Sequence, residues 1–398
     1  MFHLLLAIIY LSFISLGLPD AVLGSAWPMI YPEFNVPVSY AGIISITISA
    51  GTIFSSLQSD RLTKKFGTGK VTAFSVLLTA IALFGFSSSS SFWMMLLWAL
   101  PYGLGAGSVD ASINNYAAIH YASSHMSWLH CMWGIGASLG PYILSFTITH
   151  GQNWSMGFRY IAIFQVVLTP IIMLSLPLWN KQPVNAEIAD EISLEQLKET
   201  KPLSLKEIIR IPGAKAIFLM FFAYCALEQT AILWSSSYLV LHKGIDPETA
   251  AAYGALFLVG LTAGRAASGF VAMKLNDNQM IRLGQIIVFI GIVMMLSPFG
   301  DMISLVGLIV IGIGCAPIYP CVIHSTPINF GADKSQAIVG VQMACAYLGS
   351  LVMPAIFGLI ANHINPALFP YYLLLILALM FVMHIRLMKV IKKKCYAI

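Results

Sequence analysis

The sequence predicts an all-α integral membrane protein with twelve transmembrane helices in two pseudo-symmetric six-helix bundles. Of its 398 residues, 58% are hydrophobic and only 9% are charged, whereas ordinary soluble domains contain about 25% charged residues. The apolar runs are about 20 residues long, which is the length a helix needs to cross a bilayer, and they do not alternate like the strands of a barrel. A long charged segment divides the runs into six plus six.

Each predicted span is a continuous apolar run bounded by charged, glycine-rich or serine-rich connections. The expected spans are 4–30, 38–59, 71–87, 92–118, 127–149, 158–179, 214–240, 249–272, 281–297, 303–323, 336–361 and 368–388. Pro317 and Pro320 lie in the tenth run and predict a kink or hinge there.

This pattern predicts three parts: an N-terminal bundle over 1–179, a linker over 180–212, and a C-terminal bundle over 213–398 with a basic tail. The linker holds five basic and six acidic residues. Its second part, 203–211, is amphipathic, and we expect it to lie along the membrane surface.

The basic residues predict the orientation. Eighteen of the 21 Lys and Arg lie on the side of the linker and the C-terminal tail, two lie on the other side, and Arg265 lies within a span. Cytoplasmic loops carry the excess of Lys and Arg, so both termini are expected in the cytoplasm. The N-terminus lacks a basic stretch before its apolar run, so we expect it to be retained as a span in the inner or plasma membrane.

The two halves also repeat in sequence. An offset of 213 residues relates Tyr40 to Tyr253 and Gly51 to Gly264, and it does the same for Arg61–Lys274, Gly136–Gly349 and Pro141–Pro354. A parallel repeat of this kind is a known transporter plan, in which the substrate binds near the membrane midplane.

Four charged residues fall well inside spans: Asp20, Asp110, Glu228 and Arg265. A charge at the bilayer centre costs about 3 kcal/mol on insertion scales, so such residues usually face a cavity or a partner. The three acids lie in spans one, four and seven, which a parallel repeat makes equivalent. A carboxyl group that is alternately buried and wetted binds and releases protons near neutral pH, so the acids are candidates for proton coupling.

Structural roles are the alternatives. Asp20 follows a proline and could satisfy freed backbone groups. Asp110 could bind a neighbouring helix, and Glu228 could form a static pair with Arg265. Arg265 could equally hold an anionic group of a solute.

Asp110 belongs to a helical stripe with Gly103, Gly107 and Asn114, at positions i, i+4, i+7 and i+11. Aromatic and amide side chains near the charged residues suit a polar solute such as a sugar. The candidate solute-binding residues are Trp27, Asn114, Asn115, Gln229, Trp234, Arg265 and Tyr319. For the tryptophans, anchoring at the membrane interface is the alternative role.

Other classes of site have no signal. The cysteines within the spans form no C-x-x-C pair, the histidines show no metal spacing, and no nucleotide-binding loop or H-E-x-x-H motif occurs. We therefore expect no metal, no cofactor, no nucleic-acid partner and no enzyme activity. His130 is interpreted as a packing or gating residue.

The segment Asp60-Arg61-Leu62-Thr63-Lys64-Lys65 between spans two and three resembles the G-x-x-x-D-R-x-G-R-R loop of the major facilitator superfamily. Ser56 and Thr63 replace the usual glycines, which weakens the close-packing part of the motif and keeps its charges. The resemblance implies that Asp60, Arg61, Lys64 and Lys65 act as gating residues at the cytoplasmic helix ends.

Three further stretches resemble the fucose permease-like branch of sugar–proton symporters: Gly17-Leu-Pro-Asp20-Ala-Val-Leu-Gly24, Gly105-Ala-Gly-Ser-Val-Asp110-Ala-Ser-Ile-Asn114 and Trp128-Leu-His130-Cys-Met-Trp133-Gly134-Ile-Gly136. Tyr224-Cys-Ala-Leu-Glu228 and Gly264-Arg265 also look like this branch. The resemblance implies proton coupling and sugar binding at Asp20 and Asp110. The branch usually carries Glu at the second position, so the Asp leaves the substrate open.

These observations predict a monomeric secondary transporter in the lipid bilayer that carries a small polar solute, by proton-coupled symport and alternating access. H⁺ is the expected coupling ion and Na⁺ the alternative. A proton-coupled exporter of drugs or lipids is the rival within the same fold. A non-transporting receptor or scaffold is the rival from another class, and the lack of a large soluble domain argues against it.

Overall fold

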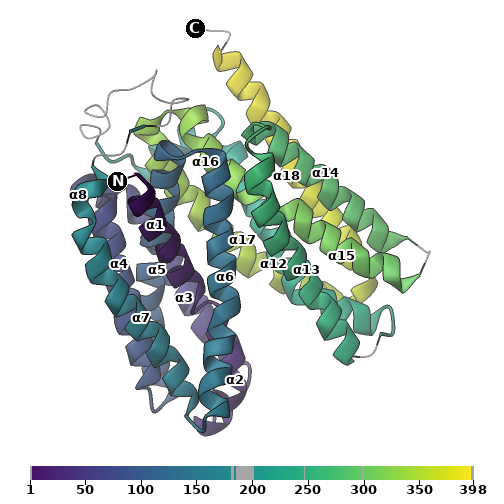
Figure 1. Cartoon of the computed structure of the whole chain (residues 1–398). Helices are drawn as coiled ribbons and strands as arrows, with labels where there is room; N and C mark the ends of the chain where they lie inside the picture. The colour runs from purple at the N-terminus through teal and green to yellow at the C-terminus, as the bar shows by residue number, and fades with distance from the viewer. Residues whose placement is uncertain (1, 181–182, 185–200, 246, 298–299, 396–398) are drawn as a thin grey trace. The chain divides into compact units, whose positions relative to one another are not determined.

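The computed structural model describes residues 2–180, 183–184, 201–245, 247–297 and 300–395, and these ranges contain helices and connecting turns. Most of the predicted linker, residues 181–182 and 185–200, lies outside the described residues. The helices (Figure 1) are α1 (Phe2–Gly17), α2 (Val22–Glu33), α3 (Tyr40–Phe66), α4 (Thr68–Ser87), α5 (Phe92–His120), α6 (Ser123–Thr149), α7 (Trp154–Leu174), α8 (Leu176–Trp179), α11 (Leu205–Arg210), α12 (Ala214–Leu241), α13 (Pro247–Val271), α14 (Asp277–Leu296), α15 (Asp301–Cys315), α16 (Ile318–Phe330), α17 (Ala332–His363), η1 (Pro366–Leu368) and α18 (Phe369–Cys395).

Eleven helical stretches in the described residues are long and apolar enough to span a membrane, and Leu256–Val271 is a shorter apolar helix. Each coincides with one of the twelve predicted spans. The predicted fold class, an all-α membrane protein with twelve spans, is therefore confirmed.

The chain forms two compact units. Unit 1 comprises Met1–His120 and Leu129–Pro202, and unit 2 comprises Tyr121–Trp128 and Leu203–Ile398. The first turns of α6 thus belong to unit 2, and the rest of that helix belongs to unit 1.

Two of the spans are broken helices. The first consists of α1 and α2, with a turn at residues 18–21 between them. The tenth consists of α15 and α16, and Pro317 forms the N-cap of α16. The predicted kink at Pro317 is therefore confirmed, because a proline has no N–H to continue the hydrogen-bond ladder of the preceding helix.

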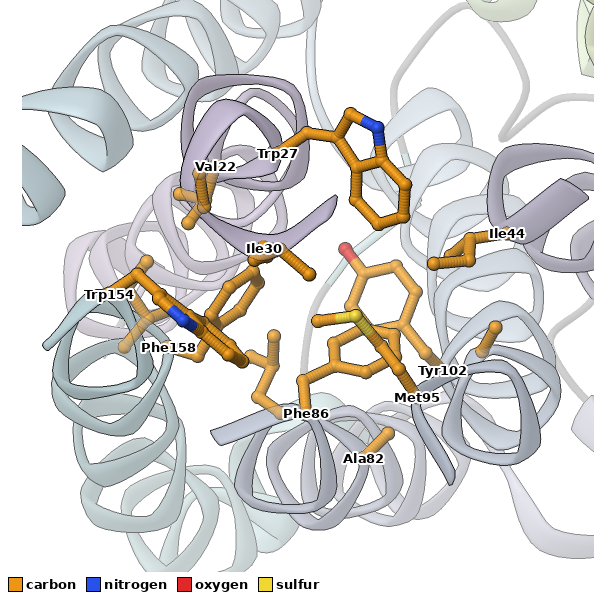
Figure 2. Packing of buried hydrophobic residues seen from close by; sticks show 14 of the residues in the cluster. Val22, Trp27, Ile30, Ile44, Ala82, Phe86, Met95, Tyr102, Trp154 and Phe158 are labelled. Carbon is orange, nitrogen blue, oxygen red and sulfur yellow. The ribbon is translucent and has the colours of Figure 1, made fainter. Parts of the chain in front are cut away.

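A hydrophobic core closes one end of unit 1. Figure 2 shows Val22 and Ile30 of α2 beside Trp154 and Phe158 of α7, and Trp27 of α2 on the side of Tyr102 in the same cluster. Side chains of α3, α4 and α5 complete the same cluster. Burying large apolar groups of this kind stabilises a fold by about 1.5–3 kcal/mol for each side chain. This core fixes α2, and so fixes where the turn between α1 and α2 lies.

Glycines bring α3 and α5 into backbone contact. A Cβ atom added at Gly103 would lie 2.2 Å from the carbonyl oxygen of Ile48, and one at Gly107 would lie 2.2 Å from that of Thr52. The glycines of the predicted stripe therefore face α3. They give close helix packing and do not line open space.

The same contacts recur in unit 2 and define the internal repeat. A Cβ atom at Gly312 of α15 would lie 2.2 Å from the carbonyl oxygen of Phe257 in α13. Gly103 and Gly312 are 209 residues apart, and so are their partners Ile48 and Phe257. The single offset of 213 is therefore wrong for these helices, because the connections in the two halves differ in length.

The segment with the charged motif is helical. We expected Asp60 to Lys65 in a loop between spans two and three, but α3 continues to Phe66. The connection to α4 is Gly67 alone, whose φ of 81° is readily adopted only by glycine. The turn therefore falls at the first residue after Asp60 that tolerates this conformation.

Candidate functional site

Asp20 lies in the turn between α1 and α2 and is exposed. The indole N–H of Trp133, from α6, donates a hydrogen bond of 2.8 Å to its Oδ2. The Tyr102 hydroxyl of α5 lies within hydrogen-bonding reach, and Asp110 lies close enough to interact electrostatically. Side chains of α5 and α6 therefore converge on an acid that a helix break presents to water.

Asp110 is half-buried on α5 and is held by the next turn of its own helix. The Asn114 amide nitrogen lies 2.7 Å from Asp110 Oδ1, and the Asn114 carbonyl oxygen lies 3.1 Å from His130 Nε2 of α6. Because an amide oxygen only accepts, Nε2 of His130 carries the proton in this arrangement. The chain His130–Asn114–Asp110 therefore fixes which end of the amide faces the acid.

Unit 2 contains a separate charged pair. Nη2 of Arg265 on α13 lies 3.2 Å from Oε1 of Glu228 on α12, and the side chains are 4% and 13% exposed. The predicted alternative of an ion pair between these two residues is thus the arrangement in the structure. A buried ion pair holds both charges at a fixed position.

Aromatic side chains surround this pair. The Tyr319 ring of α16 packs on Phe221 and Tyr224 of α12, with ring centroids 4.7 Å and 5.9 Å apart. Its hydroxyl donates to Met343 Sδ of α17 at 3.2 Å. Tyr319 therefore lies in the same part of unit 2 as Glu228 and Arg265.

The internal repeat relates the two clusters. The spacing of 209 residues that relates α5 to α15 also takes Asp110 to Tyr319, across the break in span ten. In the first helix of each half, Ile14 and Phe222 offer equivalent carbonyl contacts to Gly136 and Gly349. Their spacing of 208 takes Asp20 to Glu228. Asp20 of unit 1 and Glu228 of unit 2 are thus equivalent acids. Asp110 of unit 1 is equivalent to Tyr319 of unit 2, which carries a phenol.

The predicted tryptophans occupy packed positions. Trp27 is 4% exposed, and its indole N–H donates to the carbonyl oxygen of Val38 at 2.7 Å. Trp27 lies in α2 and Asp20 lies in the preceding turn at 18–21, so the two residues do not share one helical face. Trp234 donates to the carbonyl oxygen of Pro354 at 2.9 Å and packs against Phe357.

The two remaining amides differ. Asn115 is 5% exposed, and its Oδ1 lacks a hydrogen-bond partner within the part of the chain that the structure describes. Gln229 is half-buried beside Glu228. The Asn115 amide oxygen and the Ser112 hydroxyl are therefore buried polar groups of α5 without a hydrogen-bond partner among the described residues.

The motif residues lie at the end of α3. Asp60 is 4% exposed, and Lys64 Nζ lies 3.0 Å from its Oδ1. Lys64 also donates to the carbonyl oxygen of Lys201 at 3.2 Å. Arg61 and Lys65 are exposed, the former near Gln58 and the latter over the Phe66 ring.

Ser56 replaces a motif glycine without opening the packing. It is fully buried, and its hydroxyl donates to the carbonyl oxygen of Gly107 at 3.2 Å. The close approach is supplied by the glycine on α5, which is why a serine fits on α3.

Sequence reasoning missed Trp133 and Tyr102 as partners of Asp20, and it gave His130 only a packing or gating role. Trp133 and His130 lie three residues apart in one of the stretches that resemble the sugar symporters, and this spacing was the available signal. In the described residues, no group of three or more His, Cys, Asp or Glu side chains could hold a metal ion.

The chain is similar to known proteins. The family model described as Major Facilitator Superfamily matches residues 9–354. Bypass of stop codon protein 6 of Saccharomyces cerevisiae is 23% identical over 93% of this chain and 79% of its own length. The glucose/mannose transporter GlcP of Bacillus subtilis is 21% identical over 89% of this chain and 88% of its own.

The fold also matches a solved transporter. The crystal structure of the E. coli fucose:proton symporter FucP superposes with a TM-score of 0.72, at 16% identity, over 96% of this chain and 97% of that one. At this identity the likeness concerns the fold alone.

Proposed function

Because the chain belongs to the Major Facilitator Superfamily and is a multi-pass membrane transporter, we propose that it moves a small polar solute, in the first instance a sugar, by proton-coupled symport. Solute and proton would cross by alternating access of the two halves around a shared site. The glucose/mannose transporter and the fucose:proton symporter, by their names, carry hexoses, and they support this substrate class.

The cluster of two acids in unit 1 carries the proposal. Asp20 is exposed and bound by the Trp133 indole, while Asp110 is half-buried and bound by the Asn114 amide. These named partners are neutral, so neither acid has its charge fixed by an ion pair with them. A carboxyl group in such surroundings can exchange a proton as its access to water changes.

The two acids have different surroundings, and we assign them different roles. Asp20, exposed in a helix break, exchanges the coupling proton. Asp110 and Asn114, oriented by His130, bind hydroxyl groups of the solute, because a carboxylate and an amide together offer acceptors and donors. In unit 2, Arg265, Glu228 and Tyr319 are the candidate polar contacts for the solute.

The test is uptake by proteoliposomes with an imposed inward proton gradient, with labelled glucose, mannose and fucose as first solutes. Asp20→Asn should abolish gradient-driven accumulation and keep solute counterflow, which needs no proton movement. Asp110→Asn should lose both activities. Asp333→Asn, a change at an acid paired with Lys334 outside the cluster, is the matched control and should keep both.

Gradient-driven uptake that survives in both Asp20→Asn and Asp110→Asn refutes the coupling assignment. Uptake driven by a sodium gradient alone would make Na⁺ the coupling ion. If the three sugars fail and expressing cells instead gain resistance to cationic dyes, the exporter becomes the better reading.

We further propose that 1–179 and 213–398 are the two moving bundles and 180–212 their linker, that both termini lie in the cytoplasm, and that the transporter works as a monomer in the inner or plasma membrane. Eighteen of 21 basic residues on one side support this orientation. Selective labelling of the tail from each side of sealed vesicles tests it.

A further inference from the structure

Unit 2 contains a buried polar cluster that the transport mechanism above does not use. His324 of α16 is 2% exposed, and its Nδ1 lies 2.6 Å from Oδ2 of Asp277, the first residue of α14. Its Nε2 lies 3.1 Å from the carbonyl oxygen of Tyr121. The Ser123 hydroxyl donates to the other oxygen of Asp277 at 2.6 Å.

This geometry sets the number of protons in the cluster. The Tyr121 carbonyl oxygen can only accept, so Nε2 of His324 must carry a hydrogen. Nδ1 and the carboxylate oxygen lie 2.6 Å apart, and two lone pairs would repel at that separation, so a hydrogen lies between them as well. The Ser123 hydroxyl donates to the other carboxylate oxygen of Asp277. The pair therefore holds one proton more than a neutral histidine beside a carboxylate.

The local field favours a charged pair. Asp277 lies in the first turn of α14, where Asn276 and Gln279 form a capping box. A helix N-terminus stabilises a negative side chain. The extra proton therefore resides on His324, as an imidazolium facing a carboxylate.

When the segment Tyr121–Ser123 is not in place, His324 no longer needs a hydrogen on both ring nitrogens. A neutral histidine with its hydrogen on Nδ1 can donate to Asp277, and its Nε2 then needs no acceptor. We infer that His324 and Asp277 form a second proton-binding site, which takes up one proton when the segment Tyr121–Ser123 docks on α14 and α16.

Other ionisable groups surround the site. Cys321 of α16 lies 3.6 Å from the Ser123 hydroxyl and interacts with Asp277. Tyr121 and His125 come from the docked segment, with their rings 5.9 Å apart. Arg282, one turn further along α14, interacts with His384 of α18. The carboxylate of Asp277 lies in direct contact with His324.

The sign of the pH effect follows from proton counting. The docked segment binds one more proton than the undocked one, so docking is favoured at low pH and is lost as pH rises. One proton changes the docked-to-undocked ratio by about tenfold per pH unit across the transition. On the predicted topology the site lies at the cytoplasmic end of its helices. Acidification of the cytoplasm would therefore hold the segment Tyr121–Ser123 on α14 and α16.

Pulsed electron spin resonance on the full-length protein in nanodiscs tests this without any solute. Ala122 and Lys274, both exposed, are replaced by cysteine and spin-labelled in a chain whose native cysteines other than the buried Cys321 are alanine. The short-distance population should fall as pH rises from about 5.5 to about 8.5, around the ordinary histidine value.

Three variants make the result specific. In Asp277→Asn the amide can donate to the unprotonated Nδ1 and still accept from Ser123, so docking should persist at every pH. His384→Gln changes another buried histidine of unit 2 and should keep the full pH response. Should Asp277→Asn fail to fold, His324→Gln, which cannot take up a proton, should also give a flat profile. A flat wild-type profile, or a pH response unchanged in Asp277→Asn and His324→Gln, overturns the assignment.

Discussion

The Glu228–Arg265 pair gives a prediction whose size follows from its geometry. Two unit charges 3.2 Å apart attract by about 5 kcal/mol at an effective dielectric constant of about 20. Burial of each ion costs several kcal/mol, so the pair is near neutral in net stability. Removing one partner keeps the burial cost and loses the attraction.

Arg265→Met or Glu228→Gln should therefore each lower the free energy of unfolding by about 3–5 kcal/mol. The double variant, which buries neither charge, should lose less than either single variant. The assay is denaturation by sodium dodecyl sulfate in mixed micelles, followed by intrinsic fluorescence. Arg210→Met, at an exposed position of unit 2, is the control and should stay within about 0.5 kcal/mol of the wild type.

Additive losses in the double variant would refute this reasoning, because they would mean that the two side chains do not share one interaction. A single-variant loss below about 1 kcal/mol would mean that water screens the pair as it does on a surface.

Three further changes have expected outcomes. Gly107→Ala should destabilise by about 1–3 kcal/mol in thermal melts, because its Cβ would meet a backbone carbonyl of α3 at 2.2 Å, whereas Gly24→Ala meets nothing within 4 Å and should be neutral or stabilising. Hydrogen bonds from the side chain and backbone of Ser204 hold the pKa of Glu207 below its ordinary 4.5. The cap of α11 should therefore be complete above pH 4.5 and weaken as the pH falls through the folded-state pKa of Glu207, which lowers the protection of the α11 amides from hydrogen exchange. Ser204→Ala should show low protection both above and below this pKa, and high protection in this variant would contradict the prediction. His130→Leu should lower gradient-driven uptake about tenfold by freeing the Asn114 amide, and His130→Gln, which keeps a donor, should recover most of it; equal losses would point to packing alone.

Hydrophobic run lengths were sufficient to predict the fold. A span must be about 20 apolar residues long whatever it packs against, so all twelve positions and the break at Pro317 could be read from the sequence. The same uniformity hides which face a helix turns to its neighbours, because lipid and protein interior are both apolar. The sequence therefore left close packing and open space as alternatives for Gly103 and Gly107, and the structure has them packed on α3.

The acids could be predicted from the sequence because placing a charge in a membrane costs free energy. Their hydrogen-bond partners could not be predicted. Asp20 meets Trp133 only because the chain turns between α1 and α2, and a regular helical projection cannot anticipate a turn. The same turn separates Trp27 from Asp20. The predicted offset of 213 residues between the halves was wrong for α3 and α5 for a related reason, since one offset cannot describe repeats whose loops differ in length.

The pairing of Glu228 with Arg265 has an electrical consequence. Moving one elementary charge through the membrane potential changes its energy by about 2.3 kcal/mol per 100 mV. The pair has no net formal charge, and the Trp133 indole and Asn114 amide that bind Asp20 and Asp110 are neutral. We therefore expect voltage to act on the steps in which unit 1 changes its charge. Transport currents recorded on a supported membrane should then disappear in Asp20→Asn, which moves no coupling proton, and remain in Arg210→Met.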